Sequence, residues 1–419
     1  MSLQTAAVPR AGLFGWWQQG TPEARKALIA AALGWMLDSF DVMLYALVLT
    51  SIMADLGIGR DTAGALGSAT LLASAAGGMM FGVVADRFGR TRALIGSVLI
   101  YSVFTAACGL ATTVTQLAVF RILLGIGMGG EWASGAALVS ETWPAEHRGK
   151  ALGLMQSAWA VGYGLAALVT MIVLPLWGWR AVFFVGVLPA FFTLWVRRNV
   201  EEPELWRNRQ SKPLGSRAKF RDIFAGNMWR LTLAITLMNA FTMFAWWGFN
   251  LWLPGYLQMP ASAGGVGLST TMMTSFVIAM QVGMWFGYVT FGFVSDVFGR
   301  RRSYVVYTLT AAALILLYIS VSAPLVLLSL GPFVAFFATG YFSGFGAVTA
   351  EIYPTDIRAT AQGFTYNIGR IASAAAPYAV GSLAQTQGFG LALSTTSVAF
   401  VLAAVMWVWI PETRGRVLR

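Results

Sequence analysis

The sequence has little charge, one cysteine and one histidine. Only 11% of its 419 residues are charged and 57% are hydrophobic, with a mean hydropathy of +0.68. A chain this apolar cannot hide its nonpolar surface inside a water-soluble globule. The single cysteine, Cys108, excludes an intrachain disulfide and a cysteine-based metal cluster, and the single histidine, His147, has no partner for a metal site. No nucleophile, base and orienting group stand together, so an enzyme is not predicted.

The net charge of +11 does not indicate a nucleic-acid-binding surface. The basic residues lie in short gaps between long apolar runs and do not gather on one folded face. Residues 1–20 lack the apolar core and small-residue cleavage site of a signal peptide. The composition therefore predicts a membrane protein without a cofactor or a metal, whose surroundings are the lipid bilayer.

Long apolar runs are abundant. A helix needs about 20 apolar residues to cross a hydrocarbon layer of about 30 Å, because each backbone amide must bond within the segment. Twelve such segments predict an all-α membrane protein with twelve transmembrane helices. Their approximate limits are 26–53, 62–85, 92–112, 115–140, 150–174, 178–197, 229–256, 268–294, 303–321, 324–350, 359–386 and 389–410.

The basic residues are distributed unevenly over the predicted loops. All but four of the 28 Lys and Arg residues lie at the chain ends, in the even-numbered loops or in the central stretch. The exceptions are Arg60 and Arg180 in the opposite loops, and Arg121 and Arg370 inside predicted spans. Loops rich in Lys and Arg face the cytoplasm. We therefore expect both termini and the central stretch to be cytoplasmic, in a bacterial inner membrane.

Two motifs recur at one fixed distance. Gly82-Val-Val-Ala-Asp86-Arg-Phe-Gly89-Arg90 returns 210 residues later as Gly292-Phe-Val-Ser-Asp296-Val-Phe-Gly299-Arg300. Glu141-Thr-Trp-Pro144, with Arg148, returns at the same offset as Glu351-Ile-Tyr-Pro354, with Arg358. Two motifs with one offset indicate an internal duplication. The prediction is an N-terminal six-helix bundle (residues 1–198), a cytoplasmic linker (199–226) and a C-terminal six-helix bundle (227–419).

With these motifs the sequence resembles the major facilitator superfamily over nearly its whole length. The resemblance implies two pseudo-symmetric bundles that rock about a midplane site and open it to each side in turn. It also implies a cytoplasmic gate of charge pairs that holds the outward-facing state. The expected gate residues are Gly82, Asp86, Arg87, Arg90, Glu141, Arg148, Asp296, Arg300, Glu351 and Arg358. Alternatively, the charges only anchor helix ends among headgroups, but anchors need no fixed carboxylate spacing.

Five ionisable residues fall inside predicted spans, where charge is costly and function is the default hypothesis. Asp38 and Asp41 lie three residues apart on one helix face, where close like charges favour protonation of at least one. Arg121 and Glu131 are separated by about 15 Å of helix rise, so each must find a partner elsewhere, with the first span as the expected source. We predict Asp38, Asp41 and Glu131 as proton carriers, with Asp38 alternatively the structural partner of Arg121.

The fifth residue, Arg370, belongs to one of three similar helix faces. These faces consist of Tyr366, Asn367 and Arg370, of Gln156, Trp159 and Tyr163, and of Gln281, Trp285 and Tyr288. Such stripes are often only helix packing. Arg370 favours a binding site, because its span offers no acid and a guanidinium binds a carboxylate through two hydrogen bonds. We predict the following substrate-binding residues: Arg121, Arg370, Tyr366, Asn367, Gln156, Trp159, Tyr163, Gln281 and Trp285.

Span seven contains an aromatic cluster with two interpretations. Trp246, Trp247, Asn250 and Trp252 lie near the outer end of this helix. They supply either an aromatic wall of the binding site or a belt at the membrane interface.

The intramembrane residues refine the resemblance. Gly34-Trp-Met-Leu-Asp38-Ser-Phe-Asp41, together with the stretch from Arg121 to Glu131, resembles the sialate and monocarboxylate proton symporters. Asp356-Ile-Arg358 and Gly369-Arg370-Ile resemble the nicotinate-type organic-anion transporters. The chain departs from the sialate carriers, which have additional helices in mid-chain, and from eukaryotic lactate carriers, which have a more polar span seven.

The resemblance implies a monomeric, proton-coupled symporter of a small organic anion. A monocarboxylate is expected, such as lactate, pyruvate or a sialate- or nicotinate-like acid. A proton-coupled drug or metabolite exporter is an alternative, although a cationic substrate leaves Arg370 unexplained. A membrane sensor that does not transport is another, and the short stretch after Ile410 disfavours it.

Overall fold

The computed structural model describes residues 15–202, 220–226 and 228–414, and this part of the chain contains helices and no strand. The first helices are α1 (Gly15–Gln19), α2 (Pro22–Leu56), α3 (Arg60–Phe88), α4 (Arg90–Cys108), α5 (Val114–Thr142), α6 (Ala145–Val185) and α7 (Leu188–Asn199). The others are η1 (Phe220–Phe224), α9 (Met228–Gln258), η2 (Ala261–Ala263), α10 (Thr270–Phe298), α11 (Arg300–Ile319), α12 (Pro324–Thr339), η3 (Gly340–Gly344), α13 (Phe345–Ile352), α14 (Thr355–Ser373), α15 (Ala375–Gln387) and α16 (Phe389–Met406).

Each of the twelve predicted spans has a helical counterpart. Ten segments of the described chain are long and apolar enough to cross a membrane. One of them, His147–Val196, covers two predicted spans. The chain turns between these two spans at Gly178, whose φ of 75° is not helical although the residue lies within the bounds of α6. Span eleven is divided between α14 and α15, neither of which qualifies alone. The prediction of an all-α membrane protein is confirmed.

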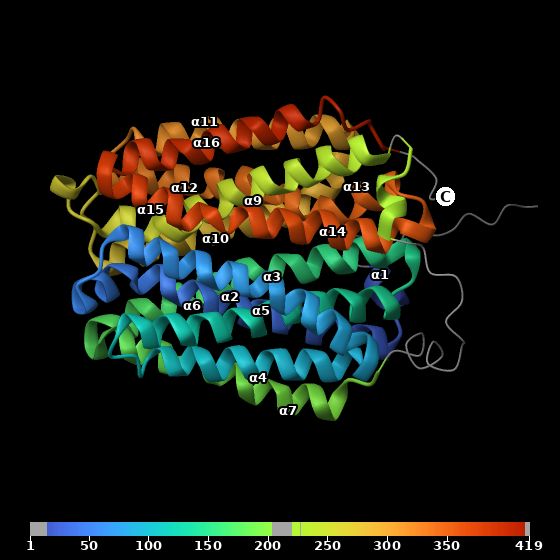
Figure 1. Cartoon of the computed structure of the whole chain (residues 1–419), viewed down its shortest axis with the longest axis horizontal. Helices are drawn as coiled ribbons and strands as arrows, with labels where there is room; N and C mark the ends of the chain where they lie inside the picture. The colour runs from blue at the N-terminus through green and yellow to red at the C-terminus, as the bar shows by residue number, and fades with distance from the viewer. Residues whose placement is uncertain (1–14, 203–219, 227, 415–419) are drawn as a thin grey trace, which may run out of the picture.

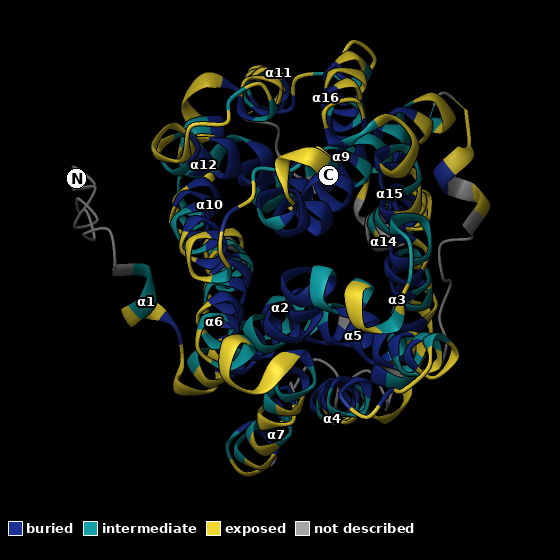
Figure 2. Cartoon of the chain, turned by 90° about the vertical axis from the view of Figure 1, so that its left-hand side faces the viewer, coloured by how far each residue is buried: buried dark blue, intermediate teal, exposed yellow. Residues whose placement is uncertain are grey.

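The helices form two groups that face each other. Figure 2 shows α2 to α7 in one group and α9 to α16 in the other. We call them the N-terminal half and the C-terminal half. The halves contact each other mainly through α2 with α9, α6 with α10, and α3 with α14 and α15. The predicted domain boundaries stay a prediction, and residues 203–219 of the predicted linker lie outside the described residues.

The two ends of the molecule differ in their basic residues. Most helices run along the long axis in Figure 1, and α1 and the C-terminal segment lie at the same end. The α3–α4 and α10–α11 junctions, with Arg90 and Arg300, also lie there, and we call it the basic end. The α2–α3 junction lies at the opposite end, which we call the far end. Arg60 begins α3 at this junction, and Arg180 pairs with Asp55 in the last turn of α2.

The repeated motifs require glycine at these two junctions. Gly89 and Gly299 have φ values of 121° and 95°, which a residue with a side chain rarely adopts. A Cβ on Gly299 would also lie 2.7 Å from a carboxylate oxygen of Glu412, and one on Gly89 would collide with Glu202. The motif glycine therefore allows a sharp helix–helix turn and leaves room for a carboxylate.

Span eleven is broken beside Arg370. Helix α14 ends at Ser373 and α15 begins at Ala375, so Arg370 lies in the last turn of α14. Pro377 explains the break, because a proline has no N–H for the carbonyl four residues earlier. Its own carbonyl accepts a hydrogen bond from Trp252 Nε1 at 2.9 Å, which anchors the broken span to α9. Interrupted helices are typical of transporter binding sites.

Candidate functional site

A small cavity of about 30 Å³ lies between the two halves. Ten side chains from both halves line it: Trp35, Gln156, Trp159, Met243, Trp246, Trp247, Tyr288, Phe342, Tyr366 and Arg370. Seven of these carry aromatic rings, and Arg370 is the one charged group among them. A space of this size holds about two water molecules. An organic ligand therefore enters only when the lining side chains move apart.

Aromatic pairs connect the two halves around this cavity. Trp159 lies edge-on to Trp247, with ring centroids 6.1 Å apart. Trp132 stacks on Tyr366 at 4.4 Å with an interplanar angle of 6°. Each pair joins a helix of the N-terminal half to one of the C-terminal half, and such pairs contribute about 0.5–1.5 kcal/mol beyond their buried area.

Arg370 is the cation of the cavity. Its side chain is buried, at 4% exposure, and its Cζ lies 5.6 Å from the centre of the Tyr366 ring. It makes no ion pair with any residue in the described part of the chain. The carboxylates of Asp38 and Glu131 interact with it electrostatically at longer range. A buried guanidinium without an ion pair among the described residues is suited to a carboxylate ligand.

Three buried carboxylates lie in the N-terminal half, and they have different surroundings. Asp38 and Glu131 interact with each other and with Arg370, and Glu131 packs against Gly34 of α2. Asp41 instead packs beside Thr105 of α4 and Gly186. Neither oxygen of Asp41 or of Glu131 has a hydrogen-bond partner among the described residues. Asp38 and Glu131 do not line the cavity, but they interact electrostatically with its cation, whereas Asp41 packs away from it against α4 and Gly186.

Arg121 has an aromatic partner. Its Cζ lies 3.7 Å from the centre of the Tyr45 ring, and its side chain is fully buried between α5 and α2. The first span thus supplies the partner, as expected, but the partner is Tyr45 and not Asp38. Arg121 does not line the cavity, and the Nε and Nη1 atoms of its guanidinium have no hydrogen-bond partner among the described residues.

The predicted binding residues are only partly brought together. Gln156, Trp159, Tyr366 and Arg370 line the cavity, whereas Asn367, Tyr163, Gln281, Trp285 and Arg121 do not. Asn367 and Gln281 donate to carbonyls of their own helices, those of Gly363 and Val277. Of the span-seven cluster, Trp246 and Trp247 belong to the cavity wall. Asn250 and Trp252 bind Met43 Sδ and the Pro377 carbonyl instead.

Four cavity residues were not among the predicted binding residues or the span-seven cluster: Trp35, Met243, Tyr288 and Phe342. Tyr288 was recognised only as a member of a helix face with Gln281 and Trp285. Trp35 precedes Asp38 by one helical turn, so a search along that helix face could have found it. Phe342 lies in η3, where the tenth span changes from α12 to α13. No signal in the sequence points to Met243 or to Phe342.

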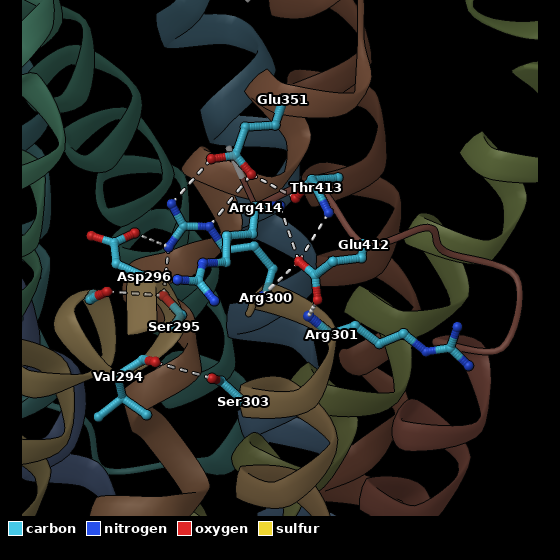
Figure 3. Close-up of polar contacts among 11 residues, drawn as sticks. Val294, Ser295, Asp296, Arg300, Arg301, Ser303, Glu351, Glu412, Thr413 and Arg414 are labelled. Carbon is cyan, nitrogen blue, oxygen red and sulfur yellow. Dashed lines mark hydrogen bonds and ion pairs between the residues drawn. The ribbon is translucent and has the colours of Figure 1, made fainter. Parts of the chain in front are cut away.

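Figure 3 shows the charge network of the C-terminal half at the basic end. Arg300 pairs with Asp296 at 2.6 Å and with Glu351 at 3.1 Å, and it donates to Ser295 Oγ at 2.6 Å. Thr413 donates to the second oxygen of Glu351. Arg300 and Glu351 are largely buried, so this network holds α10, α11 and α13 together through charge-assisted hydrogen bonds.

The N-terminal half repeats the central pair of this network. Arg90 binds Glu141 at 2.9 Å, and these residues precede Arg300 and Glu351 by 210 positions. Within the described part of the chain, these gate ion pairs join helices of the same half. A gate that spans both halves in the outward-facing state therefore stays a prediction.

The remaining gate residues give less information. The side chains of Asp86 and Arg358 lie outside the described part. Arg87 lies over the neighbouring Phe88 ring at 5.7 Å, and Arg148 has a buried Nε without a hydrogen-bond partner among the described residues. A Cβ on Gly82 would meet no described atom within 4 Å.

A third repeated carboxylate was missed from the sequence. Glu412 accepts hydrogen bonds from the backbone N–H groups of Arg300 and Arg301 at the start of α11. Glu202, 210 residues earlier, accepts from Thr91 and Arg92 at the start of α4. A carboxylate at a helix N-terminus binds free N–H groups and complements the helix dipole. Testing the 210-residue offset along the whole chain could have found this pair.

The environment of Glu412 changes its protonation. Its partial burial opposes ionisation, but hydrogen bonds from backbone N–H groups outweigh this effect and lower the pKa of the carboxyl below its ordinary value. Glu412 is thus held in the ionised form that binds the start of α11.

Arg60 joins the two halves at the far end. It donates to the carbonyls of Ala384 at 2.6 Å and Ala263 at 2.9 Å. Its Cζ also lies 4.7 Å from the centre of the Phe389 ring. These partners belong to the C-terminal half, whereas Arg180 pairs with Asp55 inside the N-terminal half.

Comparison with known proteins agrees with this architecture. The family model of the Major Facilitator Superfamily matches residues 31–288 and 259–418. The chain belongs to this superfamily. The sialic acid transporter NanX of Escherichia coli (strain K12) is 32% identical, over 94% of this chain and 95% of the relative. The cis,cis-muconate transport protein of Acinetobacter baylyi is 30% identical, over 91% and 92%.

A solved structure shows the same fold. A D-xylose-proton symporter matches with a TM-score of 0.77 at 21% identity, over 94% of this chain and 100% of that chain. The predicted two-bundle architecture of the superfamily is therefore confirmed, and the protein is a membrane transporter and not an enzyme.

Proposed function

We propose that the protein is a proton-coupled symporter of a small organic anion, with a monocarboxylate as the first expectation. Arg370 carries the proposal, because it is a buried cavity guanidinium without an ion pair among the described residues. Its need for an anion is the strongest chemical demand of the site. Two relatives are named as a sialic acid transporter and a cis,cis-muconate transport protein. These names support an organic acid as the substrate.

Coupling follows from the position of Arg370 relative to two carboxylates. Arg370 belongs to α14 of the C-terminal half, whereas Asp38 and Glu131 belong to α2 and α5 of the N-terminal half. Without substrate, the Arg370 guanidinium interacts electrostatically with both of these carboxylates. A bound substrate carboxylate neutralises that cation and adds a negative charge. Both changes make an ionised Asp38 or Glu131 more costly, so binding of the anion favours binding of a proton.

This scheme also explains why an uncoupled cycle is slow. An anion occluded beside two unprotonated carboxylates places three negative charges against one guanidinium. Burial of charge without a partner costs several kcal/mol in a protein interior. A proton removes this cost, so the halves can rock only when anion and proton are both bound or both absent.

The surroundings of the protein belong to the same proposal. We expect a monomer in a bacterial inner membrane, with both termini and residues 199–226 on the cytoplasmic side. On this view, the basic end is cytoplasmic and its motif charges form the gate. The uneven distribution of Lys and Arg supports this orientation.

Substitution of Arg370 tests the anion site. Arg370→Lys keeps the charge but loses the planar pair of donors, and Arg370→Ala loses both. We expect affinity for the transported acid to fall at least tenfold in the first variant and further in the second. Binding of a panel of labelled acids to purified protein measures this. The matched control is Arg121→Lys, which lies outside the cavity and should leave affinity unchanged. Unchanged affinity in both Arg370 variants would remove the anion site.

Substitution of the carboxylates in proteoliposomes tests the coupling. Asp38→Asn and Glu131→Gln keep the shape but lose titration, so at least one should abolish uptake driven by a proton gradient. Exchange of labelled for unlabelled acid should persist, because exchange need not release a proton. Asp41→Asn is the matched comparison, since Asp41 packs beside Thr105 and Gly186. Gradient-driven uptake that survives in all three variants would show that none of these three carboxylates is indispensable, and the coupling model would fail.

A further inference from the structure

We infer that the indole N–H groups of Trp35 and Trp159 form a second polar contact point for the substrate, across the interface from Arg370. They select planar acids that carry a second hydrogen-bond acceptor away from the carboxylate. This inference rests on the proposed function, because it assumes that the substrate carboxylate binds Arg370. It adds the recognition of the other end of the molecule.

The two indole groups have no hydrogen-bond partner. Trp35 and Trp159 are only 3% and 4% exposed, and neither Nε1 atom has a partner among the described residues. Buried indole N–H groups normally find an acceptor. Trp143 and Trp252, which pack elsewhere, donate to the carbonyls of Ala24 and Pro377.

Position separates this pair from other unpartnered indoles. Trp179 and Trp407 also lack a partner for Nε1, but neither lines the cavity. Trp35 and Trp159 do line it, and their rings lie 4.6 Å apart. Two unsatisfied indole donors on neighbouring residues that line a binding cavity provide a reason for a ligand to place an acceptor beside them.

The pair is held rigidly within the N-terminal half. Ser39 of α2 donates to the Trp159 carbonyl at 2.7 Å. Gly162, one turn further along α6, lets the Met36 carbonyl approach its Cα closely. These contacts fix α6 against α2, so the two donors are positioned before substrate arrives. Substrate that reaches from this pair to Arg370 therefore touches both halves at once.

The cavity wall limits the class of substrate. Seven aromatic rings and Met243 offer flat or apolar surface, and apart from Arg370 and the tryptophans the polar side chains are Gln156, Tyr288 and Tyr366. An acid with many hydroxyl groups would leave several of them without partners, which a closed site penalises strongly. A planar unsaturated or aromatic acid fits instead. It places its carboxylate on Arg370 and a ring nitrogen, hydroxyl or second carbonyl group on the indoles.

A pair of isosteric acids tests the inference. Benzoate and nicotinate have the same size and charge, and differ by a C–H against a ring nitrogen that accepts a hydrogen bond. We expect the full-length protein to bind nicotinate about tenfold more tightly than benzoate, since a site built for a hydrogen bond discriminates against an analogue that cannot make it. Competition against a labelled acid on purified protein gives the ratio of the two affinities.

Variants that keep an aromatic side chain but lose the indole N–H donor give the decisive comparison. Trp35→Phe and Trp159→Phe should bring the nicotinate to benzoate ratio close to one, mostly by weakening nicotinate. Trp246→Phe is the matched control, because Trp246 lines the cavity but is not one of the unpartnered indoles. It should keep the ratio.

The outcomes separate this inference from the proposed function. Weaker binding of both acids to Arg370→Ala would show that both bind through Arg370. If the ratio of nicotinate to benzoate affinity is then the same in wild type and in both Phe variants, the proposed indole contact is wrong and the anion site stands. A wild-type ratio near one overturns the inference in the same way. If neither acid nor any other organic acid depends on Arg370, both proposals fail.

Discussion

The two ends of the molecule use polar groups in opposite ways. At the far end, Arg60 bridges the halves through the carbonyls of Ala384 and Ala263, and Ser68 accepts a hydrogen bond from the Tyr378 N–H. At the basic end, the described ion pairs join helices within one half. The far-end contacts that join the halves use neutral acceptors, whereas the basic-end ion pairs within each half use carboxylates.

This difference matches what alternating access requires. A half that moves as one body needs strong internal contacts, which buried charge pairs supply once both partners are in place. Contacts between the halves must instead form and break in every cycle, and hydrogen bonds from one guanidinium to neutral carbonyls are easier to release. The described basic-end ion pairs therefore stabilise each half, and the contacts of Arg60 and Ser68 join the halves at the far end.

Backbone packing gives the same contrast along one helix. A Cβ on Gly64, in the far-end part of α3, would lie 3.0 Å from the Cα of Tyr378 in α15. A Cβ on Gly82, in the basic-end part of the same helix, would meet no described atom within 4 Å. At Gly64, near its far end, α3 therefore lies in tight backbone contact with the other half, whereas the space beside Gly82 is open among the described atoms.

The largest effect is expected from the basic-end network. Arg300→Ala leaves Glu351 buried without its cation and should lower the free energy of unfolding by about 3 kcal/mol. Arg301→Ala is the matched control, because its side chain is exposed and only its backbone N–H takes part in the network. Equilibrium unfolding of the purified protein measures both. Equal stability of the two variants would contradict a stabilising role of the network.

An intermediate effect is expected at the far end. Arg60→Ala removes two charge-assisted hydrogen bonds and a cation–π contact between the halves. We expect this to shift the free-energy difference between the closed and the open far end by about 2 kcal/mol in favour of the open form. Spin labels at Thr62 and Thr386 should report a longer distance in a larger fraction of molecules. Arg180→Ala, which loses only contacts within its own half, should leave the distribution unchanged. The contrast between the ends fails if both variants open the far end equally.

The smallest effect is expected from the carboxylate at the start of α11. Glu412→Gln weakens the binding of the Arg300 and Arg301 N–H groups and should reduce the free energy of unfolding by about 1 kcal/mol or less at neutral pH. Because folding lowers the pKa of Glu412, its ionised form stabilises the fold above the ordinary pKa of 4.5. That stabilisation is lost as the pH falls through the lowered pKa. The difference from wild type should therefore vanish in acid, and a constant difference would exclude titration of Glu412.

The candidate site was only partly predictable from the sequence. Arg370 was identifiable because a charge inside an apolar run is costly wherever it occurs. Helical spacing alone also placed Asn367 and Gln281 in the site, but both donate to carbonyls of their own helices. Periodicity identifies residues that share a face, and it does not identify what that face packs against.

The number of spans, the duplication and the helix–helix turns of the repeated motifs could be predicted from the amino-acid sequence. These properties depend on local composition and on motifs that repeat along the chain, such as the positive-φ glycines Gly89 and Gly299. Tertiary packing gives Asp38 and Asp41 different neighbours, and it places Arg121 on the Tyr45 ring and not in the cavity. Neither arrangement could be predicted from the sequence. The rotation of each helix and the break before Pro377 decide which buried groups meet, and both arise from packing between segments far apart in the chain.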